Sequence, residues 1–94
     1  MRHNFRELTI WKNSMELAKA VYLASANLPS DERFSLISQI NRCAISIPSN
    51  IAEGSGRTSN NEFAHFLNYS LSSSYELETQ LILANEIYKL DYTN

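Results

Sequence analysis

Apolar residues recur every three or four positions along most of this 94-residue chain. That spacing is typical of amphipathic helices, because one helical turn takes about 3.6 residues. Pro29 cannot continue a helix, and Gly54 and Gly56 are expected to end one. The pattern therefore predicts three helices, at residues 9–26, 34–53 and 60–90.

The second predicted helix has the widest apolar surface. One stripe comprises Leu36, Ile40, Cys43, Ala44, Ile47 and Ile51, and a second flank comprises Ile37, Ile45 and Ala52. A surface helix usually needs an apolar stripe of only about 100°. The pattern therefore predicts that this helix touches neighbours on two sides.

The third predicted helix begins at a capping box, in which Ser59 and Glu62 are expected to satisfy each other's free amides. Its apolar and small residues then alternate by fours and threes, a period of about 3.5 residues that is typical of a coiled-coil seam. The seam comprises Phe63, Leu67, Ser70, Ser74, Leu77, Leu81, Ala84 and Tyr88. This helix is longer than the first, so Leu83 and Ile87 are expected to remain uncovered.

These elements predict one all-α domain over residues 1–94, an antiparallel up-and-down bundle. Two glycines and two prolines are too few for the turns of a β-sandwich or barrel. Three helices are present, and the fourth is expected to be missing or supplied by another chain. Charged residues make up only 19% of the sequence, below the usual quarter, which favours a surface partly covered by a partner.

The charge is small overall but unevenly distributed. A net charge of −2 is not the footprint of a general nucleic-acid binder. Residues 1–19 nevertheless carry four basic and two acidic residues, and residues 58–94 carry one basic and five acidic residues. Two interpretations remain open, ordinary surface variation and head-to-tail attraction between subunits. If the chain binds nucleic acid, we expect phosphate contacts from Arg2, Arg6, Lys12 and Arg42.

The sequence contains no recognisable catalytic or metal-binding pattern. Cys43 is the only cysteine, so an internal disulfide is excluded, and its apolar neighbours predict a buried, inert thiol. His3 and His65 have no carboxylate and nucleophile at a recognisable spacing. We therefore expect no enzyme activity, no cofactor and no metal. No apolar run approaches the length of a membrane span, and we expect a cytoplasmic protein.

A set of polar residues on the second and third helices is the strongest candidate for a specific interaction. One interpretation is an ion-pair network that fixes the register of the helices, and the other is an arginine-bearing binding surface. The set comprises Arg42, Asn50, Glu53, Arg57, Glu76, Glu78 and Gln80.

Residues 39–57, Gln-Ile-Asn-Arg-Cys-Ala-Ile-Ser-Ile-Pro-Ser-Asn-Ile-Ala-Glu-Gly-Ser-Gly-Arg, closely resemble the signature of a known family. That family comprises four-helix-bundle proteins encoded in intervening sequences of 23S ribosomal RNA genes. Leu8 and Trp11, the turn at Leu28-Pro29, and residues 76–81 also resemble the family's other motifs. Together these features cover most of residues 5–90.

The resemblance implies short up-and-down bundles that form rings, commonly pentamers. It also implies similarity to accessory proteins of retroelements, which associate with reverse transcriptase and nucleic acid. Three features depart from the family pattern: Asn41 replaces a common arginine, Ser72 replaces a usual glycine, and Asn94 ends the chain where a fourth helix is expected. The leading hypothesis is a non-enzymatic homo-oligomeric scaffold or adaptor. The alternative is an RNA- or DNA-binding accessory protein.

Overall fold

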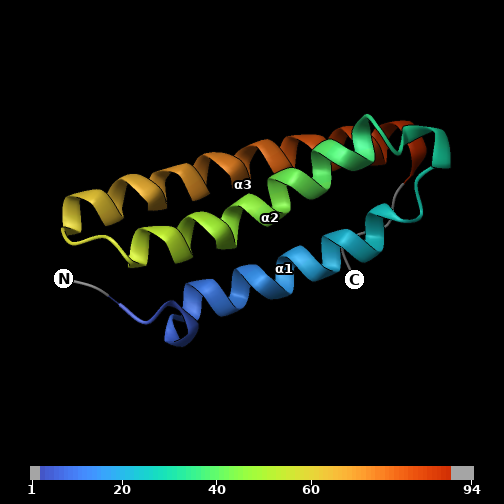
Figure 1. Cartoon of the computed structure of the whole chain (residues 1–94). Coiled ribbons are helices and arrows are strands. Elements are labelled where there is room, and N and C mark those ends of the chain that lie inside the picture. Colours follow the sequence, from blue (N-terminus) through green and yellow to red (C-terminus); the bar gives the residue numbers. More distant parts are fainter. Residues whose placement is uncertain (1–2, 90–94) are drawn as a thin grey trace.

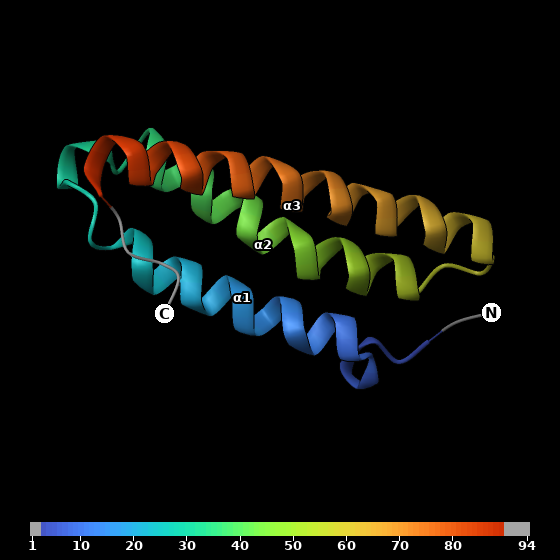
Figure 2. The same cartoon turned by 180° about the vertical axis from the view of Figure 1, so that it is seen from behind.

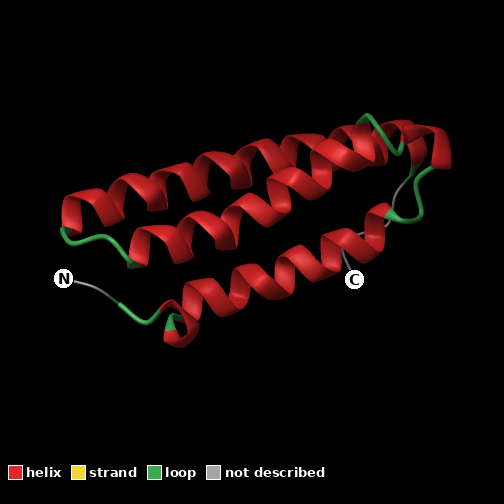
Figure 3. Ribbon diagram, in the orientation of Figure 1, coloured by secondary structure: helices red, strands yellow, loops and turns green. Residues whose placement is uncertain are grey.

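The computed structural model describes residues 3–89, and within them every regular element is a helix, joined to the next by a short loop (Figures 1 and 3). Two short 3-10 turns, η1 and η2, precede α1 and α2. The elements are η1 (Phe5–Glu7), α1 (Thr9–Ser25), η2 (Ser30–Glu32), α2 (Leu36–Ser55) and α3 (Asn60–Tyr88). All three predicted helices are confirmed, and their ends lie within about two residues of the predicted ones, the usual spread between assignment methods.

The three helices run antiparallel, with α2 between α1 and α3 in views from both sides (Figures 1 and 2). Both outer helices pack along α2, and together they form a body of 44 × 19 × 19 Å. The prediction that the second helix touches neighbours on two sides is confirmed. The four-helix bundle that the family resemblance implies is not confirmed, because residues 3–89 form three long helices.

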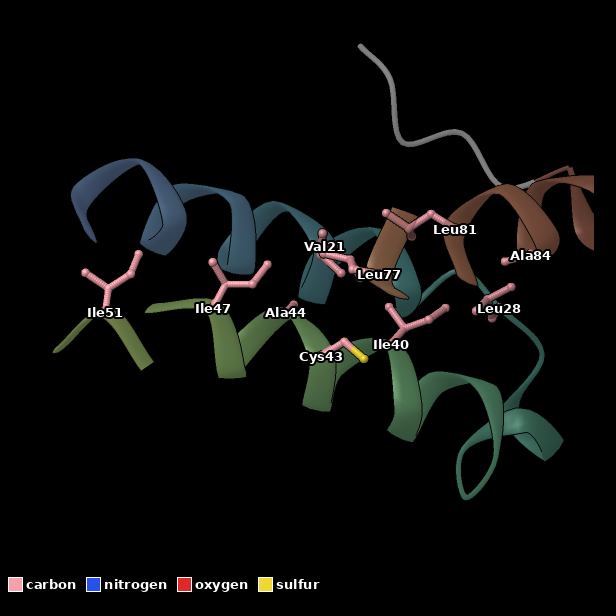
Figure 4. Packing of buried hydrophobic residues seen from close by; sticks show 10 residues of the cluster. All are labelled: Val21, Leu28, Ile40, Cys43, Ala44, Ile47, Ile51, Leu77, Leu81 and Ala84. Carbon is pink, nitrogen blue, oxygen red and sulfur yellow. The ribbon is translucent and has the colours of Figure 1, made fainter. Parts of the chain in front are cut away.

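The core is a single cluster that draws residues from all three helices (Figure 4). Its buried members are Val21, Leu28, Ile40, Cys43, Ala44, Ile47, Ile51, Leu77, Leu81 and Ala84. The apolar stripe predicted for the second helix supplies half of them. Trp11 of α1 is only half-buried and packs against this cluster.

Small residues on α3 bring it close to α2. Ser70 is buried, and its hydroxyl donates to the Ile47 carbonyl oxygen at 2.8 Å. This bond satisfies a polar group that would otherwise destabilise the interior. At the far end of α3 the Tyr88 hydroxyl donates to the Glu32 carboxylate, which also accepts from Ser35. These bonds fix the position of α3 relative to α2 and to η2.

The turn between α2 and α3 differs in two details from the sequence expectation. The helix continues through Gly54 and ends at Gly56, because Gly54 is a packing residue and does not stop the helix. A Cβ atom at Gly54 would lie 2.6 Å from the Cβ of Phe66, closer than real atoms approach. Ser59 caps α3 as predicted, accepting from the Glu62 amide, but the Glu62 carboxylate accepts from the Ser59 hydroxyl and not from its amide.

Replacing Gly54 by alanine is expected to destabilise the fold by about 1–3 kcal/mol, the usual cost of overpacking. The new Cβ would collide with the Cβ of Phe66, which can move only with the α3 backbone. The better helix propensity of alanine offsets at most about 1 kcal/mol of this cost.

The matched control is Gly56→Ala, where the added Cβ meets only the Glu53 carbonyl oxygen at 3.6 Å and the backbone φ of −86° suits alanine. Its free energy of unfolding should stay within about 0.5 kcal/mol of the parent. Urea denaturation of both variants measures the difference. Equal stabilities would show that α3 does not approach α2 this closely.

Candidate functional site

An open apolar groove of about 550 Å³ runs between α1 and α2. Its walls are almost entirely hydrophobic, with Lys19 and Ser49 as the polar exceptions. The lining residues are Trp11, Met15, Ala18, Lys19, Tyr22, Leu23, Ile45, Pro48, Ser49 and Ala52. A surface hollow of this size and composition is typical of a binding site.

The groove exists because α1 and α2 have more apolar surface than they bury against each other. Val21 and Ser25 of α1 are directed into the bundle, while Tyr22 and Leu23 remain exposed. On α2 the second apolar flank, predicted from the sequence to be in contact with a neighbour, is only partly covered. Ile45 is 55% exposed. We call this surface the α1–α2 groove.

A smaller hollow of about 270 Å³ lies between α1 and α3. Leu17 lines it from α1, and the other lining residues are Ser74, Leu77, Glu78, Leu81 and Ile82 of α3. Because α1 and α3 both pack on α2, this hollow is the place that a fourth helix would occupy in a square bundle. Leu83 and Ile87 were also expected to be uncovered, and they are 48% and 56% exposed.

Basic side chains border the α1–α2 groove on both sides. Lys19 lines it, and Lys12 lies on the same face of α1, because seven residues correspond to almost two helical turns. Arg42 has the same relation to Ser49 on α2. Glu16 offsets part of this charge through an exposed ion pair with Lys19, at 3.1 Å.

The structure does not gather the seven predicted polar residues into one network. Arg57 forms an ion pair with Glu53 at 2.8 Å, and its guanidinium lies 4.6 Å from the centroid of the Phe66 ring. Asn50 donates to the carbonyl oxygen of Ser46 at 2.8 Å, within its own helix. These contacts stabilise the end of α2 locally.

The remaining members separate around the helices. Glu76 and Gln80 flank the thiol of Cys43, whereas Glu78 lines the hollow on the other side of α3. Two residues correspond to about 200° of helical rotation, so Glu76 and Glu78 cannot share a face. Arg42 is exposed and borders the groove. The sequence spacing suggested one patch, and the helical rotation divides it.

The candidate phosphate-binding residues are also separated. Arg6 and Lys12 are exposed near one end of the bundle, where the His3 amide donates to the Ser55 carbonyl oxygen. Arg42 lies towards the other end, because its neighbour Asn41 accepts a hydrogen bond from Ser25 at the end of α1. Fourteen residues of α2 separate these two levels, about 21 Å at the helical rise. Arg2 lies outside the described residues.

Few titratable side chains among residues 3–89 are of a type that could act as a nucleophile, a base or a metal ligand. Cys43 is buried, and that burial raises its thiol pKa, with the carboxylate of Glu76 adding to the effect. A raised pKa makes a thiol unreactive at neutral pH. His3 packs against the Phe63 ring with centroids 5.1 Å apart, and His65 is exposed. No three His, Cys, Asp or Glu side chains of the described segment lie together as a metal site requires.

Sequence reasoning missed the α1–α2 groove. Trp11, Met15 and Tyr22 of the first helix recur at three- and four-residue steps, which is also the spacing of a helix face buried in a core. The available signal was the second flank of α2, where Ile45 and Ala52 extend the apolar surface beyond what one neighbour covers. The sequence could show the excess of apolar surface, but not which part of it remains open.

The comparison with protein families identifies the chain. The profile described as 23S rRNA-intervening sequence protein matches residues 6–94, which include all three helices. The chain belongs to this family. A search of curated proteins found no match.

Membership in the 23S rRNA-intervening sequence protein family confirms the resemblance that residues 39–57 indicated. It assigns no reaction and no ligand to the groove. Within the described part of this family member, none of the helices has the length and hydropathy that crossing a membrane requires.

The free energy of unfolding is expected to fall as pH rises above about 8.5, the ordinary thiol pKa in an unfolded chain. Below that pH Cys43 holds its proton in both states, so its contribution is constant. Above it the unfolded thiol ionises first, and the loss of stability continues until the raised folded pKa is passed. Urea denaturation in a reducing buffer, compared at each pH with Cys43→Ala, isolates this effect.

The pH range over which stability is lost lies between the thiol pKa of the unfolded chain and that of the folded one. Glu76→Gln should narrow this range, because it removes the negative charge beside the thiol and so lowers the folded pKa. Glu78→Gln is the matched control, since Glu78 lies on the opposite side of α3. A range equally wide in the parent and in both variants would show that Glu76 does not act on Cys43.

Proposed function

We propose that this protein is a non-enzymatic, homo-oligomeric scaffold or adaptor built from helical hairpins. The observation that carries the proposal is the α1–α2 groove, which leaves Tyr22, Leu23 and Ile45 exposed beside the buried core. An apolar hollow with exposed apolar side chains beside it is a place where a partner can bind, and a second copy of the chain would cover it. The second hollow, beside Leu17 and Ile82, gives α3 an uncovered apolar surface of the same kind.

The family supports a ring as the form of the assembly, and a pentamer is the expected size. Burial of apolar surface stabilises association by about 25 cal/mol per Å². A chain of this size has a thin stability margin of its own, so association would also protect the fold. The role in the cell is then to present repeated copies of one helical surface.

Light scattering coupled to size-exclusion chromatography should give an oligomer across the micromolar range. Leu23→Lys, which places a charge in the α1–α2 groove, should lower the mass. Phe34→Lys is the matched control, because Phe34 is 88% exposed in the α1–α2 connection and lines neither hollow. A parent protein that remained monomeric at every concentration would exclude the scaffold.

Binding to nucleic acid, or to an enzyme that acts on it, is the second candidate. Arg6 and Lys12 are exposed cations at one end of the bundle, and an assembly would repeat them. Repetition turns weak contacts into useful affinity, because later contacts form at high effective concentration. Binding of this kind neutralises phosphates, so it weakens steeply as salt rises.

A filter-retention assay with RNA and DNA should therefore show weak, salt-sensitive and sequence-independent binding. Replacing Arg2, Arg6 and Lys12 together by alanine should abolish it, whereas Arg33→Ala, which removes a cation at the other end, should not. Retention that survived the triple substitution with the same salt dependence would place the contacts elsewhere. No retention by the parent at low salt would exclude nucleic acid as a partner.

A further inference from the structure

An exposed ridge runs along the side of α3 that faces away from α1. Glu62, Tyr69, Glu76 and Leu83 form it, and all four are exposed. They are spaced by seven residues, almost two helical turns, so they follow one line along the helix. Ile87 extends the line by one further turn. We call these five residues the α3 ridge, in which acidic and aromatic or apolar side chains alternate from Glu62 to Leu83.

The α3 ridge and the α1–α2 groove lie on different sides of the molecule. Glu76 of the ridge is beside Cys43, whereas Ile45 lines the groove. Cys43 and Ile45 are two positions apart on α2, which places their side chains about 200° apart around the helix. A molecule that fills its groove with a neighbour therefore leaves its own ridge free.

The charges of the two surfaces are complementary. Lys12, Lys19 and Arg42 border the groove, and only Glu16 offsets them directly. Glu53, the next acidic residue along α2, is already paired with Arg57. The ridge carries Glu62 and Glu76 and no basic residue. Complementary charge of this kind selects the partner and its orientation.

The central part of the ridge matches the groove in length. The groove extends from Trp11 to Leu23 on α1, about 18 Å at the helical rise, and the central part of the ridge, from Tyr69 to Leu83, is about 21 Å long. We infer that the α3 ridge of one copy docks in the α1–α2 groove of the next, with Tyr69 and Leu83 in the apolar floor and Glu76 among the lysines. This interface rests on the proposed oligomeric function and specifies its contacts.

One other arrangement fits the charges less well. A two-fold contact between two grooves would place Lys12, Lys19 and Arg42 of one copy against the same residues of another, and like charges oppose such a contact.

The proposed contact joins two different surfaces, so it is head-to-tail. Each copy contributes one groove and one ridge, and addition of copies continues until the chain closes into a ring or grows as a filament. The uneven charge of the sequence thereby acquires a structural role, because the basic residues of α1 and the acidic residues of α3 meet across the interface.

Two variants test this interface. The groove variant carries Lys12→Glu and Lys19→Glu, and the ridge variant carries Glu76→Lys and Leu83→Lys. All four positions are exposed, so the helical circular dichroism and the melting curve of each variant should match the parent. Each variant alone should associate at least about tenfold more weakly than the parent, because a like charge now lies across the interface. Glu86→Lys is the matched control for charge reversal on α3, because Glu86 is exposed and belongs neither to the ridge nor to the lining of either hollow, and its association should not change.

The decisive measurement mixes the two variants. The ridge variant still has an intact groove, and the groove variant still has an intact ridge. Their mixture should regain association by analytical ultracentrifugation, because the intact groove binds the intact ridge and the charge-reversed groove and ridge attract each other. In a two-fold groove-to-groove assembly the ridge variant would dimerise by itself, which would overturn the inference.

The failure of this interface can be distinguished from the failure of the scaffold. A parent oligomer that withstands both sets of substitutions would overturn the head-to-tail contact and leave the scaffold intact. A monomeric parent would exclude both. Association of the unsubstituted parent should also weaken as salt rises, because ions screen the charges at the rim, and an unchanged association constant would contradict the proposed contact.

Discussion

The structure depends on the wide apolar face of α2, which must be covered from two directions at once. Ile40, Ala44 and Ile47 are buried where α1 and α3 meet over this face. Gly54 and Ser70 permit the close approach of α3, one through a missing side chain and the other through a small hydroxyl bonded to backbone. Since α1 and α3 both pack on α2, the molecule is organised around its middle helix.

That arrangement also determines what remains open. Three helices at the corners of a square cover the side of α2 that faces the core, but they leave the outer edge between α1 and α2 exposed, together with the position opposite α2. The two hollows lie at these places. The surfaces available for binding are therefore consequences of the packing, since the residues that line them belong to the same helices as the core.

The proposed function rests on surfaces of the described residues, above all the α1–α2 groove and the hollow beside α3. The raised pKa of Cys43 protects its thiol, and the acidic residues of α3 are dispersed around the helix. The proposed oligomeric scaffold would use the apolar α1–α2 groove and the basic residues that border it.

The sequence by itself determined the helices, the Ser59 cap and most of the core, because helical periodicity and capping are local and appear directly in the spacing of residues. It also showed that α2 and α3 have more apolar surface than one chain covers. Only the tertiary structure decided that Gly54 is a packing residue, that Glu76 lies beside Cys43 while Glu78 lines the hollow beside α1, and that Ile45 lines a groove. Each of these depends on how the helices are rotated about their axes, and that rotation is set by contacts between residues far apart in the chain.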